Sequence, residues 1–178
     1  NASAINLTRI GDLPVKRYDL MQDINTRGTF LFSKSCIPHL KQSDNAHVLT
    51  LSPPLNLAPR WLAQGGYTIS KYSMSMLTLG WAEELRERGI AANCLWPRTI
   101  IATAAVQNLL GGDAAMAGSR TPEIMADAAY EIVTRPAREC TGNTFIDDDV
   151  LAEAGVTDLS RYRHGPGSDD ELLPDLFL

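Results

Sequence analysis

Along this chain, stretches with a helical pattern of apolar side chains alternate with short runs that are apolar almost throughout. From Met21 to Ser35, apolar and small residues recur at steps of three and four, the spacing of one face of an α-helix. Proline marks the start of such stretches, and a glycine marks the end of one of them. The pattern predicts three long helices, over residues 14–38, 67–88 and 121–135.

Three apolar runs between and after these helices have the length of a β-strand. AHVLTLS at 46–52 and IAANCLW at 90–96 suit parallel strands buried on both faces, and GNTFID at 142–147 is the third run. The prolines and glycines of 53–66 predict a loop. Helices that alternate with strands are typical of an α/β fold with a parallel sheet. Ligands bind such sheets at the carboxyl ends of the strands, which points to the segments that follow the first two runs.

The acidic residues of the chain are concentrated near its end. The 178 residues carry a formal net charge of −5, and nine of the 21 acidic residues lie in 147–178. We therefore expect an incomplete catalytic domain over 1–147 and an acidic, solvated, partly ordered extension over 148–178. No cluster of basic residues suggests nucleic-acid binding, and no apolar run approaches the ~20 residues of a membrane span.

Cysteine and histidine residues are few and widely spaced. Cys36, Cys94 and Cys140 form no C-x-x-C pair, so we expect free thiols in a reducing, cytoplasmic compartment. The three histidines share no spacing typical of metal ligands, and no metal site is predicted. We expect no secretory signal peptide.

The clearest chemical motif is Tyr67-Thr68-Ile69-Ser70-Lys71 at the start of the second predicted helix. Residues four apart lie on one helical face, so the phenol of Tyr67 and the ammonium of Lys71 can reach the same place. A neighbouring positive charge favours the phenolate and makes a tyrosine a useful general acid or base for an alcohol or ketone. A half-buried tyrosine beside an extended lysine is the structural alternative.

Further motifs, in the same order along the chain, make most of 1–147 similar to the short-chain dehydrogenase/reductase family. Asn1-Ala2-Ser3 resembles the end of the family's Asn-Asn-Ala-Gly turn, and Asn25 matches a helical asparagine. HVLTLS resembles the strand before the catalytic serine, and GIAANCLWPR the strand that ends in Asn-x-x-x-Pro-Gly, with Asn93 and Pro97 in place. LSPPLNL, LWPRT and GNTFIDDDVL resemble the hydroxysteroid-dehydrogenase-like branch.

This resemblance implies a Rossmann-type doubly wound parallel sheet, of which the chain would hold the C-terminal two-thirds. It also implies an NAD or NADP cofactor, with NADP favoured, and a small-molecule substrate. Tyr67 would exchange a proton with the substrate oxygen, Lys71 would hold the nicotinamide ribose, and Asn25 would anchor a water that relays protons from Lys71. The residues implied to contact the cofactor are Asn1, Tyr67, Lys71, Pro97 and Thr103.

Three departures from the family pattern stand out. No Gly-rich phosphate loop follows a strand, so we expect the N-terminal part of the domain to be missing and residues 1–178 alone to be inactive. Pro53 stands at the position of the catalytic serine, which leaves Ser52 or Asn56 as the donor to the substrate oxygen, or leaves Tyr67 to act alone. Arg98 replaces the glycine of the Pro-Gly pair and must point away or take a new role.

The sequence therefore indicates an NAD(P)-dependent oxidoreductase that interconverts a carbonyl and a secondary alcohol. Apolar residues near the presumed site would either line a pocket for a lipid-like substrate or pack the loops: Leu55, Leu57, Trp61, Leu62, Leu109 and Leu110. A degenerate, non-catalytic member that binds a lipid or a protein partner is the alternative. A homo-oligomer is expected through helices 14–40 and 67–88, where the residues suited to close contact are Tyr72, Ser75, Met76, Leu79 and Trp81.

Overall fold

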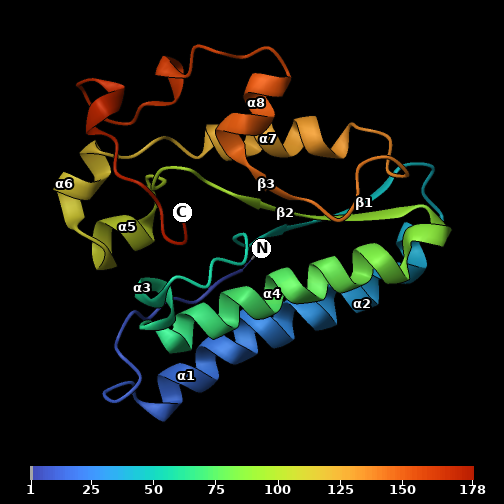
Figure 1. The fold of residues 1–178 in the computed structure, drawn as a ribbon, viewed down its shortest axis with the longest axis horizontal. Helices are drawn as coiled ribbons and strands as arrows, with labels where there is room; N and C mark the ends of the chain where they lie inside the picture. Colours follow the sequence, from blue (N-terminus) through green and yellow to red (C-terminus); the bar gives the residue numbers. More distant parts are fainter. Residues whose placement is uncertain (1) are drawn as a thin grey trace. The chain divides into compact units, whose positions relative to one another are not determined.

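The structure is a computed structural model that describes residues 2–178. The described residues form two compact units. The first contains the chain up to Leu95 together with residues 135–144 and Phe177, and the second contains residues 96–134 and 145–176 with Leu178. Figure 1 shows the elements of both units, labelled in chain order.

The predicted α/β architecture with a parallel sheet is confirmed. Strands β1 (Ala46–Leu51) and β2 (Ile90–Trp96) pair in parallel, from Ala46 opposite Ile90 to Leu51 opposite Leu95. The strand order is β1-β2-β3, with β3 at Thr144–Ile146. Strand β2 is buried at every position, as expected, whereas the middle of β1 is only half-buried, so burial on both faces is wrong for β1.

Two long helices, α2 (Gly28–Leu40) and α4 (Gly65–Glu84), lie side by side and pack against β1 (Figure 1). Small and apolar side chains fill the space between the helices and the strands. The buried core consists of Ala46, Trp81, Ala82, Leu85, Ile90 and Ala92, and Ile37, Leu40, Val48 and Leu77 pack against it.

The predicted helix over 14–38 consists of three segments. Helix α1 (Val15–Met21) continues into the π-helical segment η1 (Gln22–Arg27) and then into α2. A π turn is wider than an α turn, so it rotates the helix face that follows. The predicted apolar face is therefore wrong beyond this point, because Leu31 is exposed whereas Ser33 is buried.

The predicted helix over 67–88 begins earlier and ends earlier than expected. Helix α4 starts at Gly65, and a short helix α3 (Pro59–Leu62) lies inside the segment predicted as a loop. The turn η2 (Arg86–Arg88) follows α4, and Gly89 adopts φ 69°, the left-handed conformation that ends many helices. Gly66 allows α4 to begin close to the preceding chain. A side chain at this position would clash, because its Cβ would lie 2.4 Å from Leu13 Cδ2.

The second unit contains the helices that follow β2. Helix α7 (Glu123–Val133) begins directly after Pro122, close to the predicted position. Helix α8 (Asp147–Glu153) was not predicted, because its first residue was assigned to the third strand and the others to the acidic extension. The other helices are α5 (Ala104–Leu109), α6 (Gly112–Ala117), η3 (Ser160–Tyr162) and η4 (Asp169–Glu171). The largest fully buried side chains of the second unit are Ile124, Ile132, Val150, Leu151 and Tyr162.

Residues 148–178 are mostly exposed, as expected, but the described chain holds them at several points. The Thr121 N–H donates to the Tyr162 carbonyl at 2.6 Å, and the Ile100 N–H donates to the Leu173 carbonyl at 3.0 Å. The Asp175 N–H donates to the Arg98 carbonyl at 3.0 Å. Hydrogen bonds therefore attach the extension to the chain that follows β2. It is better ordered than the partly ordered tail that the sequence predicts. The predicted domain boundary at residue 147 stays a prediction.

Candidate active site

Tyr67 and Lys71 lie on the first turns of α4, as their spacing predicts. Both side chains are buried, with exposed fractions of 5% and 4%. The Lys71 Nζ donates to the Leu51 carbonyl at 3.0 Å, at the carboxyl end of β1. The lysine is thus fixed at the strand end where an α/β sheet binds its ligands.

Asn25 lies in the π-helical segment and its side chain is fully buried. Its Oδ1 accepts from the Ala4 N–H at 2.7 Å, and its Nδ2 donates to the Ala4 carbonyl at 2.8 Å and to Ser70 Oγ at 2.9 Å. Ser70 Oγ in turn donates to the Tyr67 carbonyl at 2.8 Å. Both amide hydrogens of Asn25 are therefore used, and this side chain fixes the first turn of α4 instead of offering an N–H to a water. The relay role of Asn25 stays a prediction.

Ser70 was missed by the sequence reasoning. It lies between the two residues of the Tyr-x-x-x-Lys motif and looks like any small helical residue. The only available signal is that a hydroxyl three residues after Tyr67 can reach back to the carbonyl of the preceding turn.

Ser52 directly follows β1, and its Oγ is buried without a hydrogen-bond partner among the described residues. It lies near the thiol of Cys94 on β2, whose pKa is raised by burial and partly lowered by hydroxyls that include those of Ser52, Thr78 and Ser75. The hydroxyl hydrogen of Ser52 can therefore be donated to the Cys94 sulfur or to a bound group. Its role towards a substrate stays a prediction.

The side chain of Asn56, the alternative donor, forms hydrogen bonds within the chain. Its Nδ2 donates to the Phe177 carbonyl at 2.9 Å, and its Oδ1 accepts from the Ala58 N–H at 3.1 Å. The Tyr72 hydroxyl donates to the Asn56 carbonyl at 2.5 Å, and burial raises the pKa of Tyr72 although this backbone contact partly opposes the rise. Asn56 therefore organises the loop between β1 and α3.

Asn93 of the Asn-x-x-x-Pro motif is buried on β2 and has a structural role. Its Nδ2 donates to the Cys140 carbonyl at 2.7 Å, and its Oδ1 accepts from the N–H and the Nδ2 of Asn143 at 3.0 and 2.9 Å. It thereby holds the turn that leads into β3.

Pro97 and Thr103, expected along the cofactor, belong to the second unit. Pro97 is buried directly after β2, and Thr103 caps helix α5, where its Oγ1 accepts from the Val106 N–H at 3.4 Å. Asn1, the remaining cofactor candidate, lies outside the described residues.

Arg98 takes a new role in the second unit. Its Nε and Nη2 form ion pairs with Asp148 at 2.5 Å and Asp149 at 2.8 Å. Its N–H donates to Asp147 Oδ1 at 2.9 Å. Asp147 is buried, and burial raises the pKa of its carboxyl to about 6 although the N–H groups of Arg98 and Asp148 oppose the rise. Three acidic residues at the start of α8 thus fix the first residue after Pro97.

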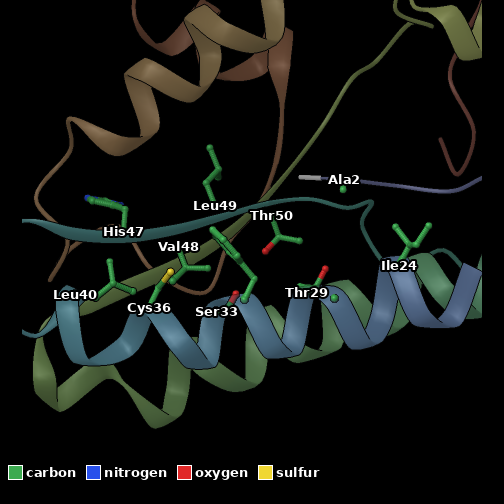
Figure 2. A pocket seen from close by; sticks show the side chains of 12 residues that line it. Ala2, Ile24, Thr29, Ser33, Cys36, Leu40, His47, Val48, Leu49 and Thr50 are labelled. Carbon is green, nitrogen blue, oxygen red and sulfur yellow. The ribbon is translucent and has the colours of Figure 1, made fainter.

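A cavity of about 480 Å³ lies between α2 and β1 in the first unit. Figure 2 shows side chains of α2, among them Ser33, Cys36 and Leu40, and side chains of β1, among them His47 and Val48. Of the described residues that line it, none is a candidate catalytic residue. The cavity lies at the edge of β1 that faces no other strand of the described sheet.

The residues exposed on α2 and α4 differ from those expected at an oligomer contact. Tyr72 and Ser75 are buried within the chain, so their assignment to an external contact is wrong, whereas the mostly buried Trp81 lines an open groove on this surface. Met76 is 64% exposed and lies in an open groove of about 590 Å³ together with Phe30.

These observations define an α/β chain with a buried tyrosine–lysine pair, and the comparison with known families agrees with it. A family model described as Enoyl-(Acyl carrier protein) reductase, from the short-chain dehydrogenase/reductases, matches residues 1–149. The chain belongs to the short-chain dehydrogenase/reductase family, and the sequence-based prediction of that family is confirmed.

Particular relatives are more similar still. Hydroxysteroid dehydrogenase-like protein 2 of Xenopus tropicalis is 53% identical over 179 residues, which cover 100% of this chain and 42% of that protein. The protein of the same name from Rattus norvegicus is 54% identical, with 100% of this chain and 33% of that protein covered. The chain thus spans less than half the length of these curated relatives.

Solved structures also resemble the chain. A short-chain dehydrogenase of Mycobacterium thermoresistibile is 59% identical, with a TM-score of 0.89 over 99% of this chain and 62% of that one. A dehydrogenase of Xanthomonas campestris is 53% identical, with a TM-score of 0.93 over 100% of this chain and 64% of that one. In the part of the chain that the structure describes, no helix is both long and apolar enough to cross a membrane.

Proposed function

We propose that the protein is an NAD(P)-dependent oxidoreductase that interconverts a carbonyl and a secondary alcohol, with Tyr67 as general acid and base. The observation that supports this most is the buried Tyr67–Lys71 pair on the first turns of α4, with Lys71 bound to the end of β1. Short-chain dehydrogenases use NAD(H) or NADP(H), and NADP is the cofactor proposed here.

The residues of this chain fit the reactive end of such a cofactor. In the proposed reduction, the Tyr67 hydroxyl donates its proton to the substrate oxygen, and the phenolate that remains is stabilised by the ammonium of Lys71. Lys71 would also hold the nicotinamide ribose. The cofactor supplies the hydride when it is bound. No Gly-rich loop for the diphosphate occurs in residues 1–178, so we propose that this loop belongs to a part of the protein outside them.

We propose a lipid-like substrate. Leucines in the first unit stand exposed on the chain between β1 and α4, with Leu57 at 71% and Leu62 at 49% exposure. Apolar side chains gathered beside a polar reaction centre suit a ligand with an apolar body. The alternative of a non-catalytic member that binds a lipid or partner rests on the proline at the serine position.

Replacement of Tyr67 by phenylalanine tests the proposed reaction in the full-length protein. Loss of the general acid should lower turnover by ~10²–10⁴-fold and leave NADPH affinity nearly unchanged. Turnover is followed by the absorbance of NADPH with 2-decanone. Tyr130→Phe, which removes the hydroxyl of an exposed tyrosine on α7, is the matched control and should keep full activity. Wild-type turnover in Tyr67→Phe would reject the assignment.

We also propose a cytoplasmic homo-oligomer. The three cysteines are free thiols, which supports a reducing compartment. A second copy would cover the groove that holds Phe30 and Met76, because a Cβ at Gly80 meets nothing within 4 Å and the two surfaces can approach closely.

Light scattering of the full-length protein tests the assembly. The wild type should have the mass of a dimer or tetramer at micromolar concentration, and Gly80→Arg should lower that mass. Tyr130→Arg, at an exposed position on α7, should leave the mass unchanged. A monomeric wild type, or an unchanged mass for Gly80→Arg, would count against this interface.

A further inference from the structure

We infer that Phe177 is a positioning residue for Tyr67: it covers the tyrosine ring and fixes its orientation for proton transfer. This inference rests on the proposed function of Tyr67. It concerns a residue 110 positions away in the chain, within the acidic extension that sequence reasoning left outside the site.

Phe177 is the centre of an aromatic cluster in the first unit. Its ring is fully buried and stacks on the Tyr67 ring at a centroid distance of 6.0 Å and an interplanar angle of 26°. The rings of Tyr72 at 5.2 Å and Trp61 at 5.6 Å tilt against it at 52° and 54°. One phenylalanine therefore contacts the candidate catalytic tyrosine and two further aromatic side chains.

The neighbours of Phe177 are anchored independently. The Tyr72 hydroxyl donates to the Asn56 carbonyl and accepts from the Asn56 N–H at 3.2 Å. Asn56 Nδ2 donates to the Phe177 carbonyl at 2.9 Å, so the backbone of Phe177 is held as well as its ring. The ring of Phe177 is thus a rigid surface for Tyr67.

The backbone of Phe177 shows that this placement is imposed by its surroundings. Among the described residues, it is the only non-glycine residue with positive φ, at 76°. Such a conformation is unfavourable for a bulky side chain and persists where surrounding contacts determine it. Strained residues of this kind cluster at functional sites, and here the strain places a ring on Tyr67.

The consequence for Tyr67 is control of its orientation and of its access to water. The backbone of Tyr67 is held through Ser70 and Asn25, but that network does not fix the rotation of the phenol ring. A ring stacked on one face removes that freedom and excludes water from that face. A displacement of about 1 Å in a reacting group can reduce a rate by ~10²-fold, so this contact matters for turnover more than for binding.

Chemical accessibility gives a test that needs no substrate. The full-length protein is treated with tetranitromethane, which nitrates accessible tyrosines, and nitration is mapped by peptide mass spectrometry. In the wild type, Tyr67 should react slowly and the exposed Tyr130 quickly. In Phe177→Ala, nitration of Tyr67 should rise by on the order of tenfold while buried Tyr162 in the second unit stays protected. Unchanged nitration of Tyr67, or an equal rise at Tyr162, would overturn a local role.

Turnover of 2-decanone with NADPH gives the second test. Phe177→Ala should lower kcat by about 10–100-fold with little change in the KM for NADPH, and Phe177→Leu, which keeps apolar bulk, should recover part of the loss. In a Tyr67→Phe background, Phe177→Ala should have no further effect, because it acts through the Tyr67 hydroxyl. An equal loss in both backgrounds, or an unaffected kcat in Phe177→Ala, would overturn the inference. Full activity of Tyr67→Phe alone would instead overturn the proposed function.

Discussion

Asp147→Asn should make the protein less sensitive to pH near neutrality. The Asp147 carboxyl is buried at the start of α8, where its Oδ1 accepts from the Arg98 N–H and from the Asp148 N–H at 2.8 Å. Asparagine keeps an acceptor oxygen for these donors but cannot ionise. The substitution therefore isolates the cost of placing a charge at this position.

The magnitude follows from the pKa. Burial raises the pKa of Asp147 from 3.8 to about 6. As the pH rises from about 4 to 6, the unfolded chain loses this proton before the folded chain does, so stability falls across that window and levels off above it. A shift of roughly two units corresponds to about 3 kcal/mol lost by pH 7. The amide NH₂ of the asparagine will occupy the position of Asp147 Oδ2, which has no hydrogen-bond partner among the described residues. Burying this unsatisfied donor lowers stability by about 1–3 kcal/mol at every pH.

The assay is thermal unfolding of full-length wild type and variant, followed by circular dichroism between pH 4 and 8. The difference in Tm, variant minus wild type, should grow with pH by several degrees, since 1 kcal/mol shifts Tm by roughly 2–4 °C in a 150–250-residue domain. Asp149→Asn, which removes an exposed ion pair with Arg98, is the control and should change stability by less than about 1 kcal/mol. A Tm difference for Asp147→Asn that is constant from pH 4 to 8 would refute the reasoning.

Two further predictions concern the first unit. Ser52→Ala should lower kcat by about 100-fold or more if its hydroxyl donates to the substrate oxygen, whereas Asn56→Ala should lower kcat by less than Ser52→Ala, because its amide holds the Phe177 carbonyl and does not donate to the substrate. The reverse pattern would assign the donor to Asn56, and wild-type rates in both would exclude each of them. Gly66→Ala should destabilise the full-length protein by about 1 kcal/mol, because its Cβ would press on Leu13. Gly28→Ala, whose Cβ would make only an ordinary contact, should be neutral or stabilising, and equal Tm values for the two variants would contradict this account.

The sequence predicted those elements whose pattern is dictated by burial. Strand β2 is buried at all of its positions, and its continuous apolar run identified it within a residue. The spacing of Tyr67 and Lys71 on one helix likewise follows from helical geometry alone. Both depend only on neighbours in the chain, which is the information that a single sequence carries best.

Features that depend on distant contacts could not be read in this way. The π-helical segment at Asn25 is accompanied by hydrogen bonds to Ala4 and Ser70, 21 and 45 residues away. Phe177 lies at the end of the acidic extension, and it packs on rings from α3 and α4. The partners of Arg98 are likewise about 50 residues away, so an arginine in place of glycine gave no sign of where it would point.

The π turn at Gln22–Arg27 makes the number of residues in this helix as important as their identity. If one of them were deleted and the segment became regular α-helix, everything on one side of it would rotate by ~100° relative to the other. Either Asn25 would turn away from Ala4 and Ser70, or the buried side of α2 would turn outwards. Two chains that share every catalytic residue but differ by one residue here would therefore not build the same site. A relative that keeps the asparagine but has a different number of residues in this segment is therefore not expected to form the same site.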